Sequence, residues 1–279
     1  MCGVVLLIAM TRAPCLPVEL GQVPTPAAEV PVPLEPPAPA VVPPPPPPAP
    51  VPVASRETTR YTVSYGPFTI GEVRLQIAGA APGAGRVLAD GRGEGGLVGL
   101  GRIENVIATE FDLSRLDSRH WVDGRKGERT LDDHVDQPTP GQVAFSRDLL
   151  DPARTILRST ATLPGPLLDP LGFLLRLRVA PPGAAPQVLY VLDGQALWRV
   201  TVTNMGRAPF PEPGLRVPTL RLDAEAEPIL YDGSPANDPT RRHRSFSLWL
   251  SDDGPRVPLR VEMPLGLSTV VVSLAEIRR

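Results

Sequence analysis

Two adjacent acidic residues near the C-terminus, Asp252 and Asp253, are the first candidates for chemistry, because paired carboxylates can serve as general acid and base. Neighbouring residues on an extended strand point to opposite faces, so these two carboxylates cannot act on one substrate atom. The sequence Asp-Asp-Gly-Pro also has strong turn chemistry and separates two alternating apolar runs. The pair is therefore predicted to be a hairpin corner, with a lone general acid or a cation ligand as the alternative.

A glycine-rich stretch, Asp90–Gly96, invites comparison with phosphate-binding loops, in which backbone N–H groups ahead of a helix hold phosphate. The stretch lacks the lysine and the hydroxyl residue of such loops. A flexible hairpin connection is therefore predicted. No serine has the glycine-flanked context of a nucleophile elbow either.

The candidate metal ligands are the three histidines and a group of aspartates. The histidines are His120, His134 and His243. No two of them have the short spacing typical of zinc sites, so solvated surface histidines are predicted. Asp132, Asp133 and Asp136 are predicted to lie in a solvated loop, since the alternative, a calcium site, lacks the glycine-centred loop pattern. No catalytic, cofactor-binding or metal-ligating set, and no cofactor, is assigned.

One basic cluster stands out, at Arg241–Arg244. It is predicted to be a charged strand flank that discourages edge-to-edge pairing, with contact to anionic headgroups as the alternative. Elsewhere basic and acidic side chains are interspersed, and the formal net charge is −2. This pattern argues against nucleic acid as a partner, because phosphate-backbone binding needs a continuous basic surface.

The chain contains 38 prolines, and they are concentrated in the segment 17–54, which has no aromatic residue. This composition predicts a disordered proline-rich linker followed by a single β-rich domain at 55–279. Residues 1–16 carry an apolar run that is too short to span a bilayer and resembles a truncated signal or lipoprotein segment. Cys15 is the candidate for lipidation, and an unpaired thiol is the alternative.

Alternating apolar residues predict a hairpin with a bulge at Gly71 and a series of strands towards the C-terminus. The strands are expected at 60–65, 68–78, 106–113, 121–128, 142–147, 187–192, 196–204, 216–224, 245–249, 256–263 and 269–278. Between two of them lies a polar segment, 129–141. Helical spacing predicts short helices at 97–104, 151–160 and 167–178.

The fold class that follows is mainly β (α+β): a strongly curved antiparallel sheet or open β-barrel with two or three short helices. The segment 167–178 is expected to pack Leu168, Leu171 and Leu175 against the concave face of the sheet, with Leu174 beside them. Those leucines would be either core residues or a lid facing a ligand. A helix this short is marginal alone in water, so it requires that burial.

Several motifs resemble a family of exported bacterial proteins known as the domain of unknown function 3108. They are YTVSYGPFTIGEVRLQI (61–77), FDLSRLDSRHW (111–121), LLDPLGFLLRLR (167–178), YVLDGQALWRVTV (190–202) and LWLSDDGPRVPLRVEMPLGLSTVVVSL (248–274). The resemblance implies a secreted or periplasmic protein with a largely antiparallel β fold. The chain also resembles, distantly, the half-barrels of lipoprotein carriers, in which a curved sheet holds lipid chains and short helices form a lid.

This resemblance favours a non-enzymatic protein of the periplasm or outer membrane that binds an apolar or lipid-like ligand in its curved sheet. One alternative is a structural or interaction component of an envelope complex, whose partners would be envelope proteins. A second alternative is a hydrolase that acts on envelope polymers through isolated carboxylates. Membrane association would depend on the N-terminal segment alone.

The proline-rich segment yields the first testable prediction. Limited proteolysis should remove residues up to about 54 and leave the rest folded, because an unpacked spacer exposes its backbone to protease. The check is mass spectrometry of the resistant core, followed by thermal unfolding. A marked change in cooperative unfolding on deletion of the segment would contradict the prediction.

Overall fold

The structure is a computed structural model that describes residues 56–79, 86–97, 101–125, 131–139, 142–150, 153–193, 196–212, 217–236 and 243–279. The predictions for the N-terminal segment, for Cys15 and for the proline-rich linker lie outside the described residues.

The described residues form fifteen strands in one sheet and a single helix, so the chain is mainly β. The strands are β1 Arg56–Tyr65, β2 Phe68–Gly79, β3 Arg86–Leu97, β4 Gly101–Asp112, β5 Asp117–Arg125, β6 Leu131–Thr139, β7 Gln142–Leu150, β8 Ala153–Thr162, β9 Leu167–Leu168, β10 Gln187–Asp193, β11 Ala196–Pro209, β12 Pro218–Ile229, β13 Arg244–Ser251, β14 Pro258–Leu265 and β15 Ser268–Arg278. The helix is α2, Pro170–Val179.

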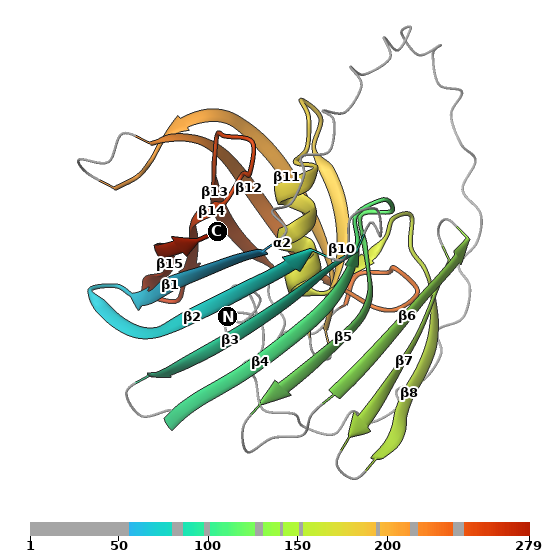
Figure 1. Ribbon diagram of the computed structural model, residues 1–279. Coiled ribbons are helices and arrows are strands. Elements are labelled where there is room, and N and C mark those ends of the chain that lie inside the picture. Colours follow the sequence, from blue (N-terminus) through green and yellow to red (C-terminus); the bar gives the residue numbers. More distant parts are fainter. Residues whose placement is uncertain are drawn as a thin grey trace, which may run out of the picture.

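The strand order is β8-β7-β6-β5-β4-β3-β2-β1-β15-β14-β13-β12-β11-β10-β9. Two meanders are therefore joined where the first strand pairs with the last, and β8 and β9 are the ends of an open sheet. All pairs are antiparallel except β9 with β10. Figure 1 shows the sheet curling around α2, with β1–β8 on one side and β10–β15 on the other. The expected curved antiparallel sheet is confirmed.

The first hairpin combines the alternating pattern with a bulge. Inward-facing residues of β2, such as Leu75, are buried, and their neighbours are exposed. Val63 pairs with Gly71 and Ser64 pairs with Thr69, which leaves Ile70 as an extra residue. The predicted bulge next to Gly71 is confirmed, and bulges increase strand twist.

Two predicted helices are wrong. Leu97 ends β3 and pairs with Gly101 at the start of β4, so the described part of 97–104 is extended. The described part of 151–160 belongs to β8, where Ser159 pairs with Phe145 of β7. Apolar residues at three- and four-residue intervals in such short segments do not exclude a strand. The stabilisation from pairing with an adjacent strand exceeds that of a helix this short, which is marginal in water.

Two predicted loops are also wrong. Asp90–Gly96 lies within β3 and pairs on both sides, with β2 and with β4. It is neither a hairpin connection nor a phosphate loop. The polar segment 129–141 contains the strand β6, which pairs with β5 and β7. Of its described polar side chains, Asp132 and His134 are at least partly exposed and Asp133 is paired with Arg147, so polarity alone did not indicate a loop.

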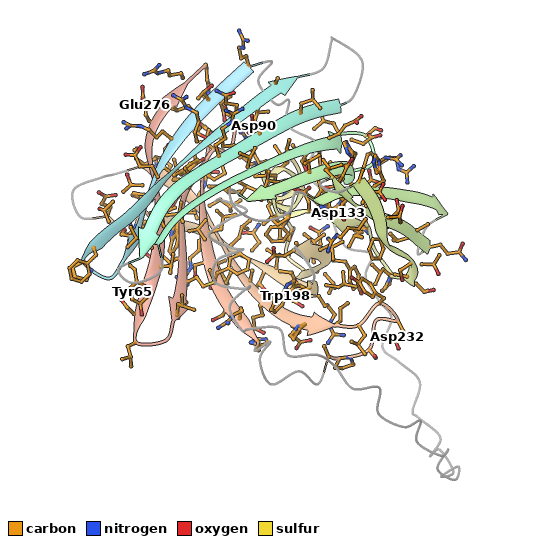
Figure 2. All side chains as sticks on the ribbon, turned by 90° about the horizontal axis from the view of Figure 1, so that it is seen from below. Tyr65, Asp90, Asp133, Trp198, Asp232 and Glu276 are labelled. Carbon is orange, nitrogen blue, oxygen red and sulfur yellow. The ribbon has the colours of Figure 1, made fainter. Side chains whose placement is uncertain are left out.

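The helix predicted at 167–178 is confirmed with a later start. Leu167 and Leu168 form the short strand β9, and Asp169 caps the helix. Every residue of α2 except Arg176 is buried, so the expected single apolar stripe is wrong, and Leu168 lies outside the helix. The main hydrophobic core surrounds α2 and includes Trp198, which Figure 2 shows inside the curve of the sheet.

A buried ion pair ties the C-terminal end of α2 to β1. Nη1 and Nη2 of Arg178 donate to the two carboxylate oxygens of Glu57 at 2.6 and 2.8 Å. Nε of Arg178 donates to the carbonyl of Pro255 at 2.6 Å, and Arg279 lies 3.2 Å from Glu57. Both side chains of the main pair are almost fully buried. An intact buried ion pair has a small net effect on the free energy of folding, whereas loss of one partner destabilises the fold strongly, because the other charge stays buried.

Removing one partner should therefore destabilise the fold. Arg178→Met should lower the free energy of unfolding by about 3 kcal/mol, because it leaves the Glu57 carboxylate buried with less compensation. Combining it with Glu57→Leu should recover part of the loss. Arg207→Met, which removes an 84% exposed arginine from its ion pair with Asp252, is the control and should change stability by at most about 0.5 kcal/mol. Urea unfolding measures all three, and additive losses in the double variant would contradict the prediction.

Candidate functional site

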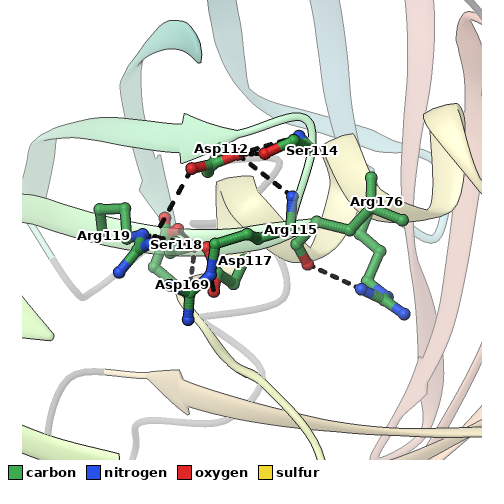
Figure 3. Close-up of polar contacts among 9 residues, drawn as sticks. Asp112, Ser114, Arg115, Asp117, Ser118, Arg119, Asp169 and Arg176 are labelled. Carbon is green, nitrogen blue, oxygen red and sulfur yellow. Dashed lines mark hydrogen bonds and ion pairs between the residues drawn. The ribbon is translucent and has the colours of Figure 1, made fainter. Parts of the chain in front are cut away.

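The N-terminal end of α2 is fixed by a buried polar cluster (Figure 3). The Asp169 carboxylate accepts hydrogen bonds from the N–H groups of Leu171 and Gly172, both at 3.0 Å, and from the hydroxyl of Ser118 at 2.6 Å. The Ser118 oxygen in turn accepts from the Asp169 N–H at 3.2 Å. A Cβ on Gly172 would lie 1.9 Å from that oxygen, so only glycine fits. The cap therefore joins α2 to β5.

Burial raises the pKa of Asp169 above its ordinary value, although the hydrogen bonds that it accepts favour the charged form. Burial likewise raises the pKa of Asp117, against the charges of Arg119 and Arg115. Arg119 lies 3.3 Å from Asp117, and Arg115 lies 3.1 Å from it. These acidic groups have structural partners, so the cluster serves to anchor the turn between β4 and β5.

The helix also contacts this turn directly. Nη1 of Arg176 donates to the carbonyl of Leu116 at 2.7 Å. Leu116 has a φ of 56°, in the left-handed region, and its N–H donates to the carbonyl of Asp112 at 2.7 Å. The turn thus keeps a strained backbone that the contact with α2 helps to hold.

Sequence reasoning singled out Leu168, Leu171 and Leu175 as core or ligand-facing residues. All three lie in the main core with at most 2% of their surface exposed. The helix that carries Leu171 and Leu175 packs against β4, β5, β9 and β10. The concave face is therefore occupied by the chain's own side chains, and a ligand-facing role for these leucines stays a prediction.

The acidic pair at the C-terminal corner is confirmed as a turn between β13 and β14. Asp253 accepts hydrogen bonds from the hydroxyl of Ser251 and from the N–H of Arg256. Asp252 instead pairs with Arg207 at 2.6 Å. The two carboxylates have separate structural partners, so they do not act together.

The three histidines are at least partly exposed, as predicted, but two of them lie together. His120 of β5 and His134 of β6 lie directly opposite each other, and their rings stack with centroids 4.4 Å apart. Asp132 lies beside both, whereas His243 is elsewhere, near Glu225. The sequence hid this cluster because it predicted a loop where β6 lies. Strand pairing brings residues 14 positions apart into contact.

The neighbouring aspartate points the other way. Asp133 is buried on the inner face, where Nε and Nη2 of Arg147 donate to its two oxygens at 2.6 and 3.0 Å. Burial raises the pKa of Asp133, although the bonds from Arg147 and Trp121 oppose that rise. Asp132 and Asp133 thus face opposite sides and cannot ligate one calcium ion. The side chain of Asp136 lies outside the described residues.

Two grooves lie on the outer face of the sheet, the face opposite α2. One, with a volume of about 560 Å³, crosses β1–β5 and has His120 in its wall. The other, of about 690 Å³, crosses β5–β8 and has His134 in its wall. The histidine pair therefore lies where the two grooves meet.

The described part of the basic cluster at Arg241–Arg244 does not lie at a sheet edge. Arg241 and Arg242 lie outside the described residues, and Arg244 begins β13, which pairs with β12 and β14. An interior strand needs no edge protection, so that interpretation is wrong. Contact with anionic headgroups stays a prediction.

Residues 60–275 match the family described as protein of unknown function (DUF3108). The chain belongs to this family. No curated protein matches the sequence. Within the described residues, no helix is both long and apolar enough to span a bilayer.

Solved structures extend the comparison of the fold. A β-barrel-like protein of the domain of unknown function DUF1849 from Brucella abortus is similar with a TM-score of 0.54 and 12% sequence identity, over 82% of this chain and 98% of that one. LprF from Mycobacterium bovis has a TM-score of 0.27 and 14% identity, over 80% and 85% of the two chains. The first similarity shows a shared fold, and the second is too low to carry an argument.

The cap of α2 yields a prediction. Asp169→Ala should lower the free energy of unfolding by about 2 kcal/mol or more, because it removes the cap and leaves the buried Ser118 hydroxyl without an acceptor. Asp169→Asn should lower the free energy of unfolding by less. Asp232→Ala, at an exposed aspartate that bonds Ser234 in a turn, is the control and should change little. Urea unfolding provides the measurement, and equal losses in the buried and exposed variants would refute the anchoring role.

Proposed function

We propose that this chain is a non-enzymatic protein of the bacterial cell envelope that acts as an interaction component, with its outer surface as the contact surface. The observation that carries the proposal is the position of α2. The helix lies against the concave face with every residue except Arg176 buried, and it is anchored at both ends by buried polar groups, through Asp169 and Arg178. The interior thus serves as a scaffold for the outer face.

The competing function is transport of an apolar ligand between α2 and the sheet. The apolar concave surface and the leucines of α2 favour it. Admitting a ligand would require α2 to move, which breaks the pair between Arg178 and Glu57 and the cap at Asp169. Each step leaves buried polar groups without partners, at a cost of several kcal/mol against a total stability of about 5–15 kcal/mol.

The hydrolase alternative has weaker support. A hydrolase needs an acid and a base that converge on one substrate position. The buried carboxylate of Asp133 accepts hydrogen bonds from Arg147, and that of Asp169 accepts them from N–H groups at the start of α2. Their raised pKa values follow from burial in the fold, and they point to the interior.

An envelope location is part of the proposal. The apolar run at the N-terminus, Cys15 as a lipidation candidate and the proline-rich segment as a spacer support it. Such a spacer would hold the folded region away from a membrane surface, since proline-rich chains are extended.

Binding of an apolar fluorescent dye separates scaffold from carrier. The wild-type protein should show no saturable binding of anilinonaphthalene sulfonate, because the concave face is already filled. Leu171→Asp should abolish cooperative thermal unfolding, since it buries an unpaired carboxylate in the core. Leu267→Asp, at a fully exposed turn residue, is the control and should unfold like the wild type.

The carrier function predicts the opposite pattern. Saturable dye binding by the wild-type protein, reduced in Leu171→Asp while the sheet stays folded, would overturn the scaffold proposal. The wild-type titration alone decides the question if Leu171→Asp does not fold.

A further inference from the structure

The outer face of β5 and β6 carries three side chains of metal-ligand type in a fixed register. His120 is opposite His134. Asp132 is opposite Val122, which is the next pair on the same face of the sheet. Because side chains alternate along a strand, Asp132 and His134 share the outer face, and Asp133 between them points inward. The strand pairing itself therefore gathers two imidazoles and a carboxylate.

The donor atoms of these side chains converge. Nε2 of His120 lies 2.6 Å from one oxygen of Asp132, and Nε2 of His134 lies 3.5 Å from the other. One potential ligand atom from each residue lies within 4.8 Å of the others. Ligand atoms at about 2.0–2.2 Å from a tetrahedral metal lie roughly 3.4 Å apart, so a small rotation of partly exposed side chains would complete the set.

The inner face of the same strands holds this register. Asp133 is bound by Arg147 of β7, and both side chains are nearly fully buried. Trp121, next to His120, is 2% exposed in the core and is hydrogen-bonded to Asp133. These contacts on the inner face fix the two strands that carry the ligands, which preorganises the outer cluster.

The chemistry of the set selects the ion. Two imidazole nitrogens and one carboxylate oxygen suit zinc and neighbouring divalent transition metals, whereas calcium and magnesium prefer oxygen ligands alone. Three protein ligands leave coordination positions open to water or to a partner group. The side chains of His120 and His134 are 37% and 54% exposed, so an ion can enter from solvent.

We propose that His120, Asp132 and His134 form a surface site for a zinc-class divalent metal ion, at the junction of the two outer grooves. Without metal, the Asp132 carboxylate accepts a hydrogen bond from His120 and lies beside His134. A ligating imidazole binds through an unprotonated nitrogen, so His120 would hold the ion through Nε2 as the neutral tautomer that carries its proton on Nδ1. An ion held by these residues would lie on the solvent-exposed outer face, which is the contact surface of the proposed function.

Titration of the full-length, tag-free chain with zinc tests the site. Cys2 and Cys15 are replaced by serine throughout, since thiolates bind zinc independently. Competition with a chromophoric chelator should show one zinc ion bound per chain. His120→Ala and His134→Ala should each weaken that binding at least about tenfold, because losing even an outer-shell partner commonly costs that much. Asp132→Asn should weaken it as well.

His243→Ala is the matched control, because His243 is a surface histidine outside the cluster. It should leave zinc affinity unchanged. Zinc should also raise the thermal midpoint of the wild-type and control proteins but not of the cluster variants. No stoichiometric binding, or binding equally strong in the variants that have lost a cluster histidine, would overturn the proposal. Circular dichroism confirms that each variant is folded before titration.

Discussion

The fold depends on covering the concave face of one very large curved sheet. An open sheet with an apolar face is stable only when that face is packed against another layer. Part of that layer is the ten-residue helix α2, which packs against β4, β5, β9 and β10 and is too short to be stable alone. Its burial provides the apolar contact, while Asp169 fixes its N-terminal end to β5 and Arg178 fixes its C-terminal end to β1. Helix and sheet therefore stabilise each other.

This arrangement divides the molecule into two surfaces with different roles. The inner face contains the core, the cap of α2 and the buried ion pairs. Substitutions of these residues therefore change the stability of the fold. The outer face contains the grooves and the histidine cluster, whose side chains contribute little to the core. The link between the faces is strand alternation, since Asp133 inside and Asp132 outside belong to one strand. A rigid inner face can thus position chemistry on the outer one.

The pairing of β1 with β15 joins the two meanders. The two unpaired edges of the sheet are β8 and β9. These strands are consecutive in the chain, and α2 follows β9 directly. The helix is therefore placed by the chain connection as well as by packing. A second apolar cluster, with Trp121, Phe145 and Leu197 among its members, links the two ends of the open sheet.

The sequence by itself determined the features that depend on local chemistry. Alternation indicated most strands, the bulge beside Gly71 followed from glycine, and the Asp-Gly turn residues marked the corner at Asp252 and Asp253. Tertiary structure decided the rest. Residues 153–160 form part of a strand, in spite of their helical spacing, because a neighbouring strand pairs with them. The histidine cluster exists only through the pairing of β5 with β6. Long-range pairing is the physical reason, since a linear pattern records spacing along one strand but not which strand lies beside it.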